Sequence, residues 1–282
     1  MITPRETPTV ETVGRHYDEL DVYYRDIWGE HVHHGLWKSG NETPQQACEQ
    51  LIKLAAEQAE ITEGSAVCDV GCGYGGTSRF LTSTYGAHVT GVTVSEAQLA
   101  YAREQSNGDE YPQYLLQDWM TNEFPDESFD AVISIECLTH MPDKQRYFDE
   151  IARVLKPGRK SAVYCWQVHP SPRNWEVRRL LEPICYEGRL PGMGSNDEYR
   201  AMIEAAGLEV LRYDELGKHV RKTWWICGRR LLAKLCTSPK YVKALFDSSN
   251  GNRVFALTLL RILTAYQTGA MEYGLYVMRK PE

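Results

Sequence analysis

The stretch VCDVGCGYGGTSRFL, residues 67–81, places four glycines within six positions, between an apolar segment and a helix-like segment. Gly71, Gly73 and Gly76 fit the pattern G-x-G-x-x-G, in which glycine lets the backbone approach a bound nucleotide closely. This pattern binds cofactors when it lies between a strand and a helix, as it does here. Two kinds of ligand are compatible with this loop: the pyrophosphate of a dinucleotide, or a smaller, positively charged nucleoside.

Strand-like and helix-like segments alternate on both sides of the glycine loop. Strand-like runs lie at 66–71, 87–94, 112–118, 129–136 and 160–167, and helix-like runs lie at 76–86, 95–106 and 144–156. This alternation predicts an α/β fold with a doubly wound, Rossmann-like sheet that is mostly parallel and binds ligands beyond the carboxyl ends of its strands. We expect the last strand, at 273–280, to be antiparallel.

The remaining segments predict four parts in the chain. Residues 1–60 carry two helices and are expected to roof the active site, and residues 61–216 form the cofactor-binding core. Residues 217–272 read as a helical insertion that serves either as a lid over an apolar pocket or as an oligomer interface. Residues 273–282 supply the final core strand. Residues 168–195 contain several prolines and glycines, and the alternation of strands and helices stops there.

Three features disfavour a nicotinamide cofactor. Asp69 lies two residues before Gly71, where a carboxylate suits a cationic ligand and opposes a pyrophosphate. The second strand ends in GVTVS, residues 91–95, without the acidic residue that binds the ribose of NAD. No later segment is similar to the catalytic apparatus of a dehydrogenase. The loop therefore favours a cationic nucleoside.

Five segments, in order, resemble motifs of class I S-adenosylmethionine (SAM) methyltransferases. They are DVGCGYGG (69–76), GVTVSEAQ (91–98), LLQDWM (115–120), the long segment from Ile133 to Trp166, and WGEHVHHGLW (28–37), which resembles γ-tocopherol-type enzymes especially. The resemblance covers residues 17–167 well, and it implies SAM as cofactor and methyl transfer as activity. It does not identify the acceptor.

The resemblance also implies roles for individual residues. Asp69, Gly71 and Gly73 would surround the amino acid end of SAM, Thr93 and Gln98 would bind the ribose, and Asp118 and Trp119 would meet the adenine. Ser134 and Glu136 are expected where the methyl group emerges, and Tyr17 and Tyr24 would close over the methionine end. His140 follows the fourth strand and is the candidate general base, with Glu136 beside it, because histidine takes up protons near neutral pH.

Composition excludes several other classes of protein. A net charge of −7 disfavours a nucleic-acid partner, and the basic stretch at 218–234 is interleaved with apolar residues, as a solvated helix face would be. The histidines of HVHHG, residues 31–35, have no carboxylate or cysteine at ligand spacing nearby, so no metal is expected. The polar, proline-containing N-terminus has no signal-peptide pattern, and no apolar run is long enough to span a membrane, which favours a cytoplasmic protein.

The sequence thus predicts a SAM-dependent methyltransferase for a small, largely apolar acceptor such as a prenylated aromatic, a terpenoid or an alkaloid. Carbon methylation is slightly favoured over oxygen or nitrogen by the γ-tocopherol-like character. Two alternatives stay open: an NAD-dependent oxidoreductase that uses the same glycine loop, and a SAM-binding protein without catalysis.

Overall fold

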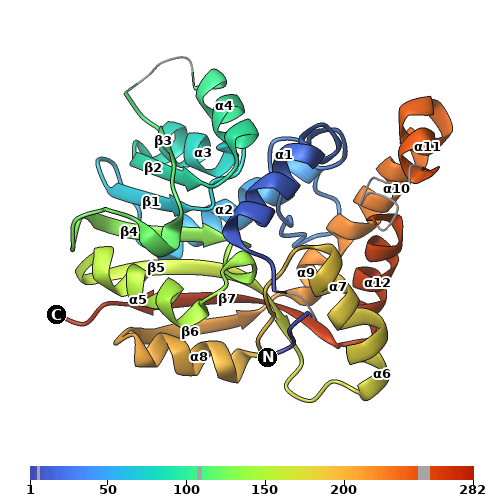
Figure 1. Ribbon diagram of the computed structural model, residues 1–282. Helices are drawn as coiled ribbons and strands as arrows, with labels where there is room; N and C mark the ends of the chain where they lie inside the picture. Colours follow the sequence, from blue (N-terminus) through green and yellow to red (C-terminus); the bar gives the residue numbers. More distant parts are fainter. Residues whose placement is uncertain (5–6, 107–109, 247–254) are drawn as a thin grey trace.

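The computed structural model describes residues 1–4, 7–106, 110–246 and 255–282 (Figure 1). Its centre is a seven-stranded sheet in the order β3-β2-β1-β4-β5-β7-β6. All pairs from β3 to β5 are parallel, and β7 is antiparallel to both of its neighbours. The predicted fold class, including the antiparallel last strand, is confirmed. The strands are β1 (Ala66–Val70), β2 (His88–Thr93), β3 (Gln113–Leu116), β4 (Phe129–Ile135), β5 (Leu155–Val168), β6 (Glu209–Glu215) and β7 (Met271–Arg279).

Helices cover both faces of the sheet because successive strand residues point to opposite sides. On one face, Val67 of β1 packs in a cluster with α2 (Pro44–Gln58) and α3 (Gly76–Tyr85). On the other face, Cys68 and Val70 pack with α5 (Lys144–Val154) and α8 (Asn196–Ala205). The central strands are therefore buried on both sides, as expected for a parallel sheet.

The N-terminal helix α1 (Val10–Ile27) is fixed against the core by close contacts. Thr9 begins it with a capping box. A Cβ atom at Gly14 would lie 2.7 Å from the carbonyl oxygen of Val94, so only glycine lets the helix approach this closely. The carboxylate of Asp18 accepts a hydrogen bond from Ser95, which precedes α4 (Glu96–Glu104). Figure 1 shows α1 between the α3–α4 side of the sheet and the helices α10–α12.

The segment after β5 is helical, which its prolines and glycines did not indicate. It contains α6 (Asn174–Glu176), a π-helical turn (Val177–Leu181) and α7 (Glu182–Glu187). Glu176 accepts from the backbone N–H of Arg173 at the start of this segment. Leu181, Ile184 and Cys185 are buried in the same cluster as residues of α12. Burial of apolar side chains against α12 therefore stabilises helices in a segment whose prolines and glycines indicate a loop.

The insertion is helical where the structure describes it. It holds α9 (Gly217–Val220), α10 (Lys222–Thr237), α11 (Pro239–Phe246) and α12 (Phe255–Thr268), while residues 247–254 lie outside the described residues. Within the described part of the chain, no helix is long and apolar enough to cross a membrane.

Candidate active site

A cavity of about 600 Å³ lies beyond the carboxyl ends of β1, β2, β3 and β4, where the sequence predicts ligand binding. Residues that follow these four strands line one side of it. Helix α1 and the loop at 30–33 line a second side, and residues 184–190 and α12 line a third. Every site residue predicted from the sequence lines this cavity except Ser134.

Asp69 lies at the base of the glycine loop and is almost completely buried. Its Oδ2 atom accepts one hydrogen bond, of 2.6 Å, from the hydroxyl of Ser78. Burial without a cationic partner raises the pKa of Asp69 to about 6. Gly71 and Gly73 have φ values of +76° and +54°, a region that favours glycine. The loop thus presents open backbone beside a carboxylate that lacks a counter-charge.

Thr93 and Gln98 are joined by a hydrogen bond of 2.9 Å from the Thr93 hydroxyl to Gln98 Oε1. This bond fixes which end of the amide is the oxygen and turns the amide nitrogen of Gln98 toward Gly73, where a glycine Cβ would be 4.0 Å away. The pair therefore offers hydrogen-bond donors and acceptors next to the glycine loop, as a ribose would need.

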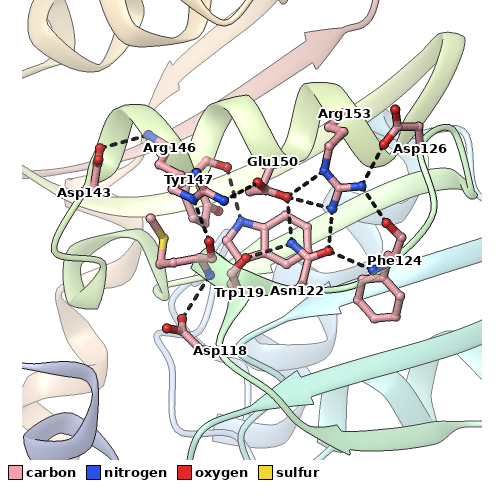
Figure 2. A network of polar contacts seen from close by, with 11 residues as sticks. Asp118, Trp119, Asn122, Phe124, Asp126, Asp143, Arg146, Tyr147, Glu150 and Arg153 are labelled. Atoms are coloured by element: carbon pink, nitrogen blue, oxygen red, sulfur yellow. Dashed lines mark hydrogen bonds and ion pairs between the residues drawn. The ribbon is translucent and has the colours of Figure 1, made fainter.

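Asp118 and Trp119 follow β3 and are held by α5 (Figure 2). The Asp118 carboxylate accepts from the backbone N–H of Met120. The indole nitrogen of Trp119 donates to the carbonyl oxygen of Tyr147, so the ring is packed into the core and only 1% exposed. Arg153 binds Asn122 and the carbonyl oxygen of Phe124, which anchors the rest of the loop. These bonds to α5 hold the loop that places Asp118 at the cavity.

Ser134 does not reach the cavity, in contrast to the expectation from its place at the end of β4. It is fully buried, and its hydroxyl donates to the carbonyl oxygen of Val70. Alternation along β4 places Ser134 on the same face as Val132, which packs with α5. Ile135 and Glu136 line the cavity, and Glu136 no longer has a strand conformation.

Tyr17 and His140 meet inside the cavity. The hydroxyl oxygen of Tyr17, on α1, lies 2.9 Å from Nε2 of His140, which follows β4. Nδ1 of His140, on the opposite side of the ring, is buried. Burial lowers the pKa of His140 to about 4, so the ring is neutral near pH 7. Burial also raises the pKa of Tyr17, so the phenol keeps its proton. The phenol donates to Nε2 in the tautomer of His140 that carries its proton on Nδ1.

A second tyrosine and histidine pair lies beside the first. Nε2 of His16 is 3.1 Å from the hydroxyl oxygen of Tyr24, and the Tyr17 and Tyr24 ring centroids are 5.3 Å apart. Burial lowers the pKa of His16 to about 3. His16 was not predicted as a site residue. Its position next to Tyr17 could have signalled a place in the site.

Glu136 is the centre of a buried hydrogen-bond network. Its carboxylate accepts from the backbone N–H and Nδ1 of His34, from Trp166 Nε1 and from the Tyr273 hydroxyl. Its φ of +63° is unusual for a residue other than glycine, and such strain is concentrated at functional sites. Burial alone would raise the pKa of Glu136, but the contacts from His34 lower it, so the carboxylate stays ionised. No pattern in the sequence indicates that His34 is its main partner.

The cavity residues fit a cationic nucleoside such as SAM. The buried carboxylate of Asp69 has no cationic partner, and Gly71 and Gly73 have no side chain that would block a ligand. Thr93 and Gln98 then provide polar groups beside the loop. Among the described residues, no group of three or more His, Cys, Asp or Glu side chains could hold a metal ion.

Comparison with known proteins agrees with this geometry. The family model for mycolic acid cyclopropane synthetase matches residues 4–267. A probable chloroplastic tocopherol O-methyltransferase of Oryza sativa subsp. japonica is 31% identical over 96% of this chain and 78% of its own length. The 27-O-demethylrifamycin SV methyltransferase of Amycolatopsis mediterranei is 28% identical over 98% of this chain and 99% of its own. The resemblance to tocopherol methyltransferases is confirmed.

Solved structures show the same fold. A mycolic acid cyclopropane synthase, crystallised with S-adenosylhomocysteine (SAH) and CTAB, superposes with a TM-score of 0.85 at 21% identity. The alignment covers 98% of this chain and 99% of the other. These matches give no support to an NAD-dependent oxidoreductase.

Proposed function

Because the chain belongs to the mycolic acid cyclopropane synthetase family and is a SAM-dependent methyltransferase, we propose that it methylates a small, largely apolar acceptor that carries a hydroxyl group. The hydrogen bond between Tyr17 and His140 is the observation that carries this proposal. It provides a route for one proton at the edge of the cofactor cavity, which an acceptor with an ionisable hydroxyl requires.

Bound SAM supplies an electrophilic methyl group on a sulfonium, and the chain supplies orientation and a place for the proton. Asp69, Gly71, Gly73, Thr93, Gln98 and Asp118 would hold the cofactor. Tyr17 donates to Nε2 of His140 and keeps a lone pair for the acceptor hydroxyl. As the acceptor loses its proton, Tyr17 takes that proton and passes its own to His140. The positive charge of the sulfonium therefore ends on the imidazole ring.

The same route serves two outcomes of methyl transfer. The acceptor oxygen can receive the methyl group directly, or a ring carbon activated by the hydroxyl can receive it while the oxygen loses its proton. Seven large apolar side chains are among those that line the cavity, which favours an acceptor that is largely hydrocarbon. They are Trp28, Trp166, Ile184, Leu190, Trp224, Leu259 and Ile262.

The predicted division of the chain is part of this proposal. Residues 1–60 would roof the site, residues 61–216 would bind SAM, residues 217–272 would cover the acceptor and residues 273–282 would complete the sheet. An oligomer through the N-terminal helices or the insertion, a cytoplasmic location and the absence of a nucleic-acid partner stay predictions.

The test combines binding and turnover. SAH at about 100 times its dissociation constant should stabilise the protein by roughly 2.7 kcal/mol, while NAD should leave the melting temperature unchanged. Prenylated hydroquinones and their dimethyl ethers, incubated with SAM, should yield SAH only when a hydroxyl is free. Tyr17→Phe and His140→Gln should each lower kcat by roughly 10²- to 10⁴-fold and keep the SAH-induced stabilisation. Full turnover by both variants would refute the proton route.

A further inference from the structure

Charge is distributed very unevenly in this acidic chain. Residues 217–246, here called the basic arm, hold eight lysines and arginines and no aspartate or glutamate, so all 38 acidic residues of the protein lie elsewhere. The arm consists of α9, α10 and α11. In Figure 1, α10 and α11 extend from the body of the molecule at the side away from β1–β3. A single-sign segment of this kind attracts an anionic partner.

One row of side chains along the basic arm faces solvent. Five side chains of this row recur at intervals of three or four residues, which places them on one side of α10 and its N-cap. They are Arg221, Trp225, Arg229, Leu232 and Cys236. All five are exposed, and Trp225 and Leu232 are 55% and 63% exposed. Cationic and apolar side chains therefore share one outer surface.

The guanidinium groups of the two arginines of this row make no hydrogen bond or ion pair with any residue that the structure describes. Other cations of the arm are bound by the protein itself. Lys222 donates to the carbonyl oxygen of Gly40, Arg230 to that of Ile27, and Lys234 pairs with Asp26. Lys222, Arg230 and Lys234 thus hold the basic arm against the rest of the protein. The guanidinium groups of Arg221 and Arg229 are available to a ligand outside the molecule.

We propose that the exposed row of the basic arm docks on an anionic lipid surface. Amphipathic helices that lie in a membrane interface combine basic residues with exposed tryptophan and leucine, and tryptophan prefers the headgroup level. A nucleic-acid duplex, which presents its phosphates outward and keeps its bases stacked inside, would leave Trp225 and Leu232 unused. A second copy would place two basic arms against each other across a symmetric interface, where like charges repel.

The inner side of the same helix connects this surface to the cavity. Trp224, next to the exposed Trp225, is 6% exposed and lines the cavity. Leu259 and Ile262 of α12, which packs against α10, line it as well. An apolar acceptor dissolved in a bilayer would therefore lie close to the cavity of a docked molecule. The docking itself goes beyond the proposed function and does not depend on it.

The experiment is flotation of the full-length protein with vesicles of phosphatidylcholine, with and without phosphatidylglycerol. We expect binding only to the vesicles with phosphatidylglycerol, and weaker binding as salt rises. Each cation near the surface contributes about a fivefold gain in partitioning, so Arg221→Gln combined with Arg229→Gln should weaken binding by roughly 25-fold. Trp225→Ser should also weaken it.

Matched variants elsewhere on the surface serve as controls. Arg178 and Arg179 are exposed arginines outside the arm, and Trp175 is a 45% exposed tryptophan. The double variant Arg178→Gln and Arg179→Gln, and Trp175→Ser, should bind vesicles like the wild type. Stabilisation by SAH confirms that each variant is folded, whatever the result with an acceptor.

Three results would overturn the proposal. The first is equal binding to both kinds of vesicle or to neither, and the second is unchanged binding by the Arg221 and Arg229 double variant. The third is a dimer, seen by sedimentation without lipid, that dissociates on Trp225→Ser and shows no vesicle binding. That result would assign the surface to a second copy of the chain.

Discussion

Nδ1 of His34 lies 2.8 Å from Oε1 of Glu136, and this contact joins the loop before α2 to the end of β4. On the other side of the ring, Nε2 of His34 lies 2.5 Å from Nε1 of Trp224. An indole N–H can only donate, so Nε2 accepts and the ring proton stays on Nδ1. His34 therefore holds the ionised Glu136 at the cavity and fastens α10 to the core at the same time.

This network predicts different effects for two adjacent tryptophans. Trp224→Phe removes one donor to Nε2 of His34 and leaves only the Tyr266 hydroxyl, at 3.3 Å, as its partner, which should cost about 1 kcal/mol of unfolding free energy. Trp225→Phe changes a side chain that is 55% exposed and should stay within about 0.5 kcal/mol of the wild type. Thermal or urea unfolding measures both. Equal losses would show that the Trp224 hydrogen bond contributes little.

Two glycines with similar backbone angles should respond differently to alanine. A Cβ at Gly71 would lie 2.4 Å from Sγ of Cys137, whereas Gly64, with φ of +73°, has nothing within 4 Å. Gly64→Ala should cost about 1–2 kcal/mol of unfolding free energy through backbone strain alone. Gly71→Ala adds a steric overlap and should lose SAH binding as well as stability. The comparison uses unfolding curves and calorimetric titration with SAH; if Gly71→Ala bound SAH normally, the close approach of the loop would be irrelevant to the cofactor.

The pKa of Asp69 predicts how SAH binding depends on pH. The ammonium group of SAH favours the ionised carboxylate, and burial raises the pKa of Asp69 to about 6 in the free protein. Binding below pH 6 must therefore release a proton, so the dissociation constant should rise about tenfold for each pH unit below that value. Asp69→Asn should bind more weakly at pH 7.5 and lack this slope. A wild-type affinity that is constant from pH 7.5 to 5 would exclude Asp69 as the ammonium partner.

The fall of the reaction rate at low pH should report the protonation of His140. Because burial lowers the pKa of His140 to about 4, the ring is a free base at all higher pH values. We expect kcat at saturating SAM, where the weaker cofactor binding caused by Asp69 no longer affects the rate, to fall only near pH 4, well below the pKa of about 6.5 of an ordinary histidine. A fall near pH 6.5 would point to an exposed group instead.

Stability must be followed in parallel with this profile. The folded-state pKa of His140 lies below its unfolded value, so its contribution to stability is present above pH 6.5 and is lost as the pH falls from about 6.5 toward 4. Melting temperatures at each pH therefore separate unfolding from a loss of the base, and His140→Gln should reduce the slope of melting temperature against pH in this interval.

Much of the fold could be predicted because the signals are local. Apolar runs of strand length and the spacing between Gly71 and Gly76 each act within a few residues. The same holds for Asp69, Thr93 and Gln98, whose places follow from the strands that end beside them. Ser134 was placed wrongly because a position at a strand end leaves open which way the side chain points.

By itself, the sequence determined the α/β class, the cofactor loop and the kind of ligand that suits it, because these depend on short-range patterns of glycine, charge and hydrophobicity. The tertiary structure alone decided that Tyr17 meets His140 and that His34 meets Glu136. These partners are 123 and 102 residues apart in the chain. Only the packing of α1 and the following loop onto the end of β4 brings them together, and no pattern within either segment encodes that distance.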